Sequence, residues 1–164
     1  SFAYNLKIFI DEARAKGAHP ILVTPTSRRR FDENGKSVNT HGDYPDAVRW
    51  VAAKENVPLI ELNGMTAILF NALGVDNSTK AFVHYPAGTF PGQTRTLKDN
   101  THFSTYGAYE VSKCVIEGMK KADLEIVKYL RPDYSGFDPA QPDSFESFKW
   151  NLGSFTENEK PDGN

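Results

Sequence analysis

The sequence predicts an α/β fold in which helices cover both faces of a mostly parallel sheet. Two observations predict it. Segments with helical spacing of apolar residues alternate along the chain with short, continuous apolar runs, and these runs lack the polar alternation of half-exposed strands. The chain has 164 residues, of which 39% are hydrophobic and 24% are charged. This size and composition are typical of one soluble globular domain, or a large part of one.

The first helix and strand follow directly from the apolar pattern. Apolar residues recur at spacings of three and four from residue 2 to residue 16, which predicts an amphipathic helix that ends at Gly17. Residues 21–23 form a continuous apolar run, as expected for a strand that is buried on both faces. Residues 25–42 are polar and are predicted to be a loop.

A second helix and strand repeat the same order. Asp43 and Pro45 are typical residues for the start of a helix, which we expect to run to about Asn56. A second apolar run at residues 58–62 predicts another buried strand. The order helix, strand, helix, strand indicates parallel strands joined by helices.

The second half of the chain mixes helices with an irregular segment. Asn63 is a candidate N-cap for a third helix that ends at Gly74, and Ser104 is a candidate N-cap for a fourth. Between them, residues 75–101 show no strong periodicity and contain several Pro and Gly residues, so we predict a long loop. Loops of this length in compact domains are usually functional or disordered, and we expect a functional one.

The composition changes near residue 130. We therefore predict that residues 1–130 belong to the α/β domain and that residues 131–164 form a tail rich in Pro, Asp and Ser. We expect this tail to pack on the domain through its aromatic side chains; the alternative is a linker. Its aromatic residues are Tyr134, Phe137, Phe145, Phe148, Trp150 and Phe155.

Two buried parallel strands do not make a complete sheet, because a parallel sheet needs further strands and helices on both faces. We therefore expect this chain to be the C-terminal part of a larger α/β domain whose other strands lie in a separate N-terminal segment.

The charges and the reactive side chains exclude several classes of function. The net charge of −2 gives no overall attraction to nucleic acid or to an anionic membrane, and the only basic cluster is Arg28 to Arg30. Cys114, the single cysteine, cannot form an internal disulfide, and we expect it to be a buried, inert thiol rather than a nucleophile. The four histidines lack zinc-ligand spacing, so no metal site is expected.

The strongest chemical signal is Asp99 followed three residues later by His102, just before the helix that Ser104 caps. A carboxylate at this spacing can fold back and accept the Nδ1 proton of the imidazole, which leaves Nε2 free to act as a base. The alternative is an ordinary surface histidine near a helix N-terminus.

At this pair the sequence resembles a known family. The stretch DNTHFSTYGAYEVSKCVIEGMK, from Asp99 to Lys120, resembles the last block of the SGNH or GDSL hydrolases, above all their rhamnogalacturonan acetylesterase-like branch. Residues 2–30 and 45–63 resemble helix and strand pairs of the same branch. The resemblance implies the C-terminal part of a three-layer αβα, flavodoxin-like domain, with His102 as catalytic base and Asp99 as its partner.

The early motifs of that family are missing from the chain. No Gly-Asp-Ser motif is present to supply the nucleophile, and no Gly-x-Asn-Asp motif is present to supply oxyanion donors. The resemblance therefore implies a serine esterase whose nucleophile lies in the other segment, so that this chain alone is inactive. The implied substrate is an acetylated pectic polysaccharide or oligosaccharide, with no cofactor, and the implied location is periplasmic or extracellular.

Other residues are candidates for binding that substrate. Arg28 and Arg30 follow a strand end and could pair with a galacturonate carboxylate, or they could be a solvated charge run. His84 and Tyr85, together with Phe90, could line the cleft as a platform for a sugar ring, or they could simply pack the loop. The alternatives for the whole protein are an SGNH lipase or thioesterase, or a non-catalytic carbohydrate-binding module that retains the fold.

Overall fold

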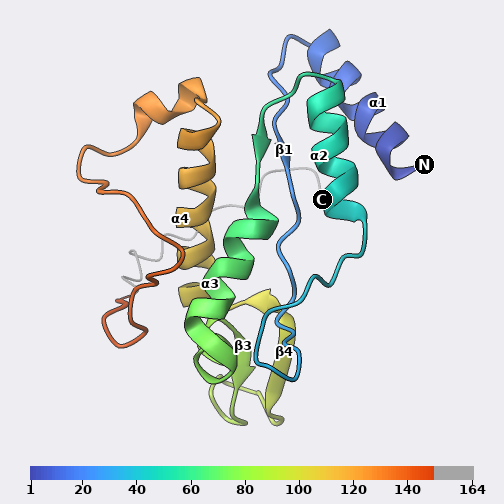
Figure 1. Ribbon diagram of the computed structural model, residues 1–164. Coiled ribbons are helices and arrows are strands. Elements are labelled where there is room, and N and C mark those ends of the chain that lie inside the picture. The colour runs from blue at the N-terminus through green and yellow to red at the C-terminus, as the bar shows by residue number, and fades with distance from the viewer. Residues whose placement is uncertain (150–164) are drawn as a thin grey trace.

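The computed structural model describes residues 1–149 and places helices on both sides of a small parallel sheet (Figure 1). Helices α1 and α2 lie on one side of the strands β1 and β2, and α4 lies on the other. A separate hairpin of β3 and β4 lies beyond the far end of α3. The elements are α1 Phe2–Ala15, β1 Leu22–Val23, α2 Tyr44–Lys54, β2 Leu59–Ile60, α3 Leu62–Asn77, η1 Ser78–Ala81, β3 Phe82–Tyr85, β4 Leu97–Phe103, α4 Thr105–Lys121 and η2 Glu125–Tyr129.

The two parallel strands pair as the helix and strand order predicted. Leu22 is opposite Leu59 and Val23 is opposite Ile60. The prediction that residues 21–23 are buried on both faces is wrong, because Val23 is 43% exposed. The reason is that, among the residues described, β1 has no pairing strand other than β2. The α/β class with parallel strands is confirmed, and the layering is that of a partial flavodoxin-like domain.

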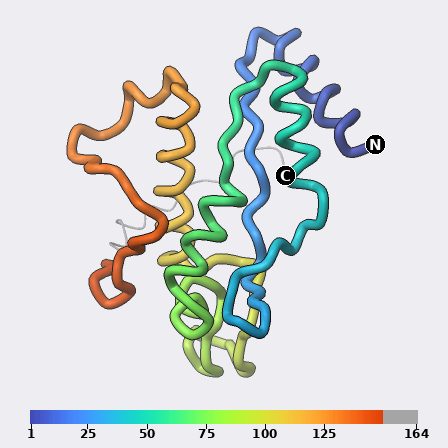
Figure 2. The backbone as a smooth tube through the Cα atoms, viewed as in Figure 1, coloured from blue at the N-terminus to red at the C-terminus, as the bar shows by residue number. Residues whose placement is uncertain are grey.

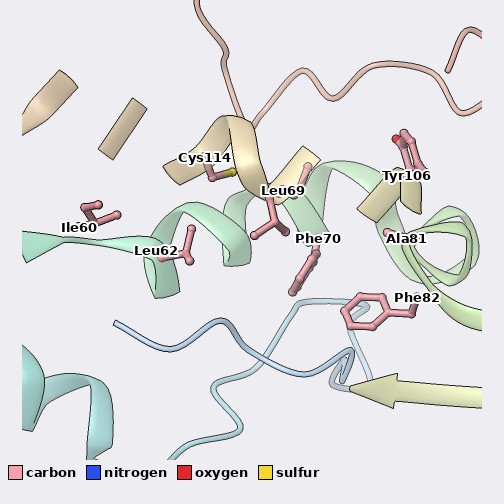
Figure 3. Close-up of a cluster of buried hydrophobic side chains, with 9 residues drawn as sticks. Ile60, Leu62, Leu69, Phe70, Ala81, Phe82, Tyr106 and Cys114 are labelled. Carbon is pink, nitrogen blue, oxygen red and sulfur yellow. The ribbon is translucent and has the colours of Figure 1, made fainter. Parts of the chain in front are cut away.

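Each side of the sheet has its own apolar core. On the side of α1 and α2, the buried residues Ile10, Val51 and Val57 pack with the half-buried Leu22. On the side of α4, a larger core joins β2, α3, η1, β3 and α4 (Figure 3). Burying one large apolar side chain stabilises the folded state by roughly 1.5–3 kcal/mol, so this second core holds the hairpin to the helices. Its buried members are Ile60, Leu62, Leu69, Phe70, Ala81, Phe82, Tyr106, Val111 and Cys114.

The third helix begins and ends at residues other than those predicted. Its N-cap is Glu61, whose carboxylate accepts from the backbone N–H of Gly64, rather than Asn63. Asn63 instead donates its side-chain amide to the carbonyl of Pro25, because the loop after β1 passes beside it. Gly74 has a φ of 72° and marks a kink, after which the backbone makes another helical turn to Asn77.

The prediction of a loop over residues 75–101 is also wrong, because this segment contains η1, β3 and most of β4. The hairpin is antiparallel, with Phe82 opposite Phe103 and Tyr85 opposite Leu97. The Phe82 and Phe103 rings are 5.0 Å apart between their centroids. Cross-strand packing of this kind can stabilise a strand that has no alternation of apolar and polar residues. The mostly polar sequence of β4 therefore forms a strand although it carries no periodic signal.

Ser104 is the N-cap of α4, as its position predicted, and its contacts also fix the start of the helix against η1. Ser104 Oγ accepts from the N–H of Gly107 and donates to the carbonyl of Lys80, at 2.6 Å. A Cβ on Gly107 would lie 1.8 Å from the carbonyl oxygen of Ala81. The helix therefore approaches the backbone of η1 too closely for any residue other than glycine at position 107.

Residues 134–148 lie along the outer side of α4 (Figure 2). The ammonium of Lys113, which is almost buried, makes 2.8 Å ion pairs with the fully buried Glu110 and with Asp143. Tyr106 donates its hydroxyl proton to the carbonyl of Asp143, and its ring contacts that of Phe148 edge to face. This part of the predicted tail therefore packs on the helix, while Trp150 and Phe155 lie outside the described residues.

Within residues 1–149, no helix combines the length and the apolar composition that crossing a membrane requires.

The close approach at Gly107 predicts that adding a side chain at this position lowers the stability of the protein. We expect Gly107→Ala to lower the free energy of unfolding by about 1–3 kcal/mol, because the new methyl group overlaps a backbone atom that has little room to move. Chemical denaturation followed by circular dichroism measures this loss.

Gly64→Ala is the matched control, because Gly64 also stands third in its helix and also donates to its N-cap. Its Cβ would meet nothing closer than 3.5 Å. This variant should be as stable as the parent or up to about 1 kcal/mol more stable, since alanine favours a helix. Equal stability of the two variants would contradict the close packing of α4 on η1.

Candidate active site

The residues Asp99 to His102 form an irregular bulge in β4. Between the paired positions Phe82 with Phe103 and His84 with Lys98, the single residue Val83 on β3 is opposite all four residues of this segment. Bulges bend a strand and redirect its side chains, and they are frequent beside active sites. We call residues 99–102 the β4 bulge.

Asp99 organises the bulge through its carboxylate. Oδ1 accepts from the backbone N–H groups of Thr101, at 2.6 Å, and of His102, at 3.0 Å. Oδ2 lies 2.6 Å from Nδ1 of the His102 ring. The predicted contact between the carboxylate and Nδ1 is therefore present in the structure, although it is made within a strand rather than at the end of a loop. Backbone and side chain of His102 are both held by the same carboxylate.

The electrostatics of the pair fit a base with its orienting group. The hydrogen bond from His102 and the two backbone N–H groups stabilise the charged carboxylate, and together they lower the pKa of Asp99 to about 2. An ionised carboxylate at Nδ1 fixes the tautomer that leaves Nε2 unprotonated, and it stabilises the imidazolium that forms when Nε2 accepts a proton. The His102 side chain is 77% exposed, so its Nε2 is open to a reactant.

The bulge lies at the end of the molecule to which the carboxyl ends of β1 and β2 point (Figure 1). The backbone N–H of Arg29, in the segment after β1, donates to the carbonyl of Asn100 at 2.8 Å. Ligands of open parallel sheets bind at this edge, where loops from several strands meet. The position therefore suits a site that combines residues from different segments.

The structure brings the predicted binding residues to the same end of the molecule. Arg28 and Arg30 are exposed and flank Arg29, whose backbone contacts the bulge. His84 Nε2 lies 2.8 Å from Oδ1 of Asn100. Tyr85 is half-buried, with its ring against that of Phe90. Their position is compatible with substrate binding, which stays a prediction.

Two residues of the site had no signal of their own in the sequence. Asn100 lies inside the bulge, where its side chain meets both His84 and Arg29. Arg29 looks equivalent to its neighbours in the sequence, yet it is half-buried while they are exposed. Nothing in a run of three arginines distinguishes the middle one, because the difference comes from the loop path across η1 and β4.

Two other kinds of site receive no support from the described residues. The Cys114 thiol is fully buried, and burial raises its pKa to about 12, so it stays protonated at neutral pH. Within residues 1–149, no group of three or more His, Cys, Asp or Glu side chains is arranged to hold a metal ion.

Helices on both sides of parallel strands, with an Asp and His pair beyond the carboxyl edge, match the arrangement of a partial flavodoxin-like domain, consistent with the SGNH hydrolases. The comparisons with known proteins then give the relatives of the chain. Over 130 residues the chain is 43% identical to the rhamnogalacturonan acetylesterase RhgT of Bacillus subtilis (strain 168) and 36% identical to the probable rhamnogalacturonan acetylesterase YesY of the same organism. The chain is thus a homologue of the rhamnogalacturonan acetylesterases, and the resemblance seen in its sequence is confirmed.

The match covers 79% of this chain but 56% of RhgT and 55% of YesY, so the chain spans about half the length of these relatives. No protein-family model matches the chain. The crystal structure of the Bacillus subtilis protein YxiM aligns with a TM-score of 0.61 at 22% identity, over 75% of this chain and 31% of that one. At this identity the likeness supports the fold alone.

The low pKa of Asp99 predicts how the pair responds to acid. Since the folded-state pKa is depressed, the carboxylate stabilises the bulge above the ordinary pKa of aspartate, and this contribution is lost as the pH falls toward 2. We expect the Asp99 carboxyl carbon to titrate with a midpoint near 2 in carbon-13 NMR. In His102→Ala the midpoint should rise toward the ordinary value, because the largest cause of the shift is removed.

His19→Ala serves as the control, since His19 is exposed and lies in the segment that joins α1 to the amino end of β1. It should leave the Asp99 titration unchanged. An Asp99 midpoint that is the same in the parent and in His102→Ala would show that the contact between the two side chains does not persist in solution.

Proposed function

We propose that this chain supplies the general base and its orienting carboxylate to a carbohydrate esterase that removes acetyl groups from a pectic polysaccharide of the rhamnogalacturonan type. The observation that carries the proposal is the 2.6 Å contact between Asp99 Oδ2 and His102 Nδ1 in a segment homologous to acetylesterases. The names of the two relatives supply the substrate class.

The proposed chemistry is acyl transfer through a serine. His102 Nε2 takes the serine hydroxyl proton while the serine oxygen attacks the acetyl carbonyl carbon. The sugar oxygen then leaves with the proton from the imidazolium, and the acetyl group stays on the serine. Water repeats the two steps, so that acetic acid is released and the serine is restored. Throughout, Asp99 stays ionised and holds the ring in the tautomer that keeps Nε2 free.

We propose that the nucleophile and the oxyanion donors belong to a segment outside these 164 residues. Among residues 1–149, His102 Nε2 has no serine hydroxyl within hydrogen-bonding distance. The N–H groups of Leu22 and Thr24 donate to carbonyls of the β2 segment, so the alternate backbone groups at Ile21 and Val23 face away from β2. A further strand can pair with β1 there.

The side chains beside β1 support this position for the second segment. An apolar groove of about 370 Å³ runs past Val23 and Leu22, between the N-terminal parts of α1 and α2. Exposed Phe2 and Tyr44 line the groove. A polypeptide that continued the sheet would cover this apolar surface, and about 44% of the length of RhgT has no counterpart in the match.

Substrate binding is proposed for Arg28, Arg30, His84 and Tyr85. The two exposed guanidinium groups suit the carboxylate of a galacturonate unit, and the ring of Tyr85 suits the face of a sugar. The same family resemblance leads us to propose a periplasmic or extracellular location, where a polysaccharide is accessible to the protein.

The test is reconstitution of hydrolysis. The 164-residue chain alone should not hydrolyse p-nitrophenyl acetate above background, because a base without a nucleophile and an oxyanion hole supplies little catalysis. Adding the segment that supplies the Gly-Asp-Ser motif should produce hydrolysis of this ester and of acetylated rhamnogalacturonan. His102→Ala should then lower kcat by at least about 10³-fold, whereas His19→Ala should not change it.

Two outcomes would count against the proposal. Full activity of His102→Ala in the reconstituted protein would show that another group is the base. Binding of acetylated oligosaccharide without any hydrolysis, in a complex shown to form, would favour the non-catalytic carbohydrate-binding alternative.

A further inference from the structure

We propose that Arg29 is a positioning residue that holds the β4 bulge in place and thereby aims the Asp99 and His102 pair. The proposal rests on the catalytic role given to His102 above, and it assigns to Arg29 a part different from the substrate contact proposed for Arg28 and Arg30.

The Arg29 guanidinium joins three segments of the chain. Nε donates to the hydroxyl of Ser78 at 2.9 Å, Nη2 donates to the carbonyl of Val75, and Nη1 donates to Oδ1 of Asn100 at 3.3 Å. Ser78 begins η1 and is fully buried, and Val75 follows the kink at Gly74. A planar group with five N–H donors can reach acceptors in three directions at once, which the single ammonium of a lysine cannot match in geometry.

The backbone of Arg29 reaches the same residue of the bulge. Its N–H donates to the carbonyl of Asn100 at 2.8 Å, so both the main chain and the side chain of Asn100 are bound to Arg29. His84 Nε2 adds a third contact to Asn100, at the side-chain Oδ1, at 2.8 Å. Asn100 directly follows Asp99. Fixing its peptide therefore fixes the direction in which the Asp99 carboxylate points.

The catalytic pair has little other support. Within the described residues, the His102 side chain contacts only Asp99 through hydrogen bonds, and Asp99 contacts only the backbone and ring of its own bulge. The orientation of the pair relative to the rest of the protein thus depends on the bulge backbone. A displacement of about 1 Å at a reacting group can lower a rate by about 100-fold, so a residue that fixes this backbone matters for catalysis.

The surroundings of Arg29 differ from those of an ordinary surface arginine. It makes no ion pair with a carboxylate among residues 1–149, and its acceptors are neutral oxygens. Partial burial lowers the pKa of Arg29, so keeping the guanidinium charged costs free energy. This free-energy cost is expected where the guanidinium stabilises the fold through its directional hydrogen bonds rather than through an ion pair.

The first test measures the tautomer of the His102 imidazole in the 164-residue chain. Nitrogen-15 NMR at pH 8 should show the His102 tautomer with the proton on Nδ1 in the parent. Arg29→Gln should give a mixture of tautomers, because the bulge no longer holds Asp99 against the ring, and Arg29→Lys should lie between the two. Arg131→Gln is the control, since Arg131 is exposed and, among residues 1–149, forms its ion pair only with Asp133. It should leave the spectrum of His102 unchanged.

A second variant keeps the test valid if replacing Arg29 prevents folding. Asn100→Ala removes the side-chain acceptor in the bulge, Oδ1, but leaves the contacts of Arg29 with Ser78 and Val75 intact. It should change the His102 tautomer in the same direction. An unchanged His102 spectrum in folded Arg29→Gln and in folded Asn100→Ala would overturn the proposal.

The reconstituted enzyme provides the kinetic test. Arg29→Gln should lower kcat by roughly 10–100-fold with little change in KM, since a displaced base slows the chemistry without removing a substrate contact. Arg29→Lys should recover part of the loss. A rise in KM with unchanged kcat would instead make Arg29 a substrate-binding residue. If the tautomer changes but even the parent shows no hydrolysis, the proposed function fails while the structural role of Arg29 stands.

Discussion

The candidate site depends on one carboxylate, which accepts hydrogen bonds from three N–H groups. Asp99 turns the chain of β4 out of its regular ladder by binding two backbone N–H groups, and it orients the His102 ring with its other oxygen. Side-chain carboxylates compete with the ladder in this way because they are short and can reach the backbone two or three residues ahead. The same carboxylate that distorts the strand therefore also orients the His102 ring.

The bulge is joined to regular structure at both of its ends. On one side, Phe103 packs on Phe82, and Ser104 caps α4 while binding the carbonyl of Lys80. On the other side, the pair of His84 with Lys98 resumes the hairpin. The glycine at position 107 lets α4 approach close enough for these contacts to form. The exposed Asp99 and His102 pair is thus linked directly to packed residues of the hairpin and to the start of α4.

The parallel sheet is well covered on the side of α4 but is left open at the edge of β1. The side of α4 carries a continuous core from β2 to the hairpin, whereas the edge of β1 carries exposed apolar residues and backbone groups turned away from β2. A chain segment that pairs with β1 would complete the sheet and reach its carboxyl edge, where the β4 bulge lies. Folding and catalysis would then be coupled, since the same association would bury the apolar edge and bring a nucleophile to His102.

Sequence by itself determined the four main helices, the two parallel strands and the Asp99 and His102 pair. Each of these depends on residues close together in the chain: the 3.6-residue apolar period, the Ser104 cap and the three-residue spacing of carboxylate and imidazole. Such local relations can be recognised in the sequence without knowledge of the rest of the fold. The family resemblance rests on the same local stretch, from Asp99 to Lys120.

Only the tertiary structure decided the β3 and β4 hairpin, the Glu61 cap and the difference between Arg29 and its neighbours. The hairpin forms because Phe82 and Phe103 meet across strands, and Glu61 caps α3 where Asn63 turns to the loop after β1. Arg29 binds Ser78 and Asn100, which are 49 and 71 residues away in the chain. Contacts over such separations depend on how the elements pack, and a local pattern of residues carries no record of that packing.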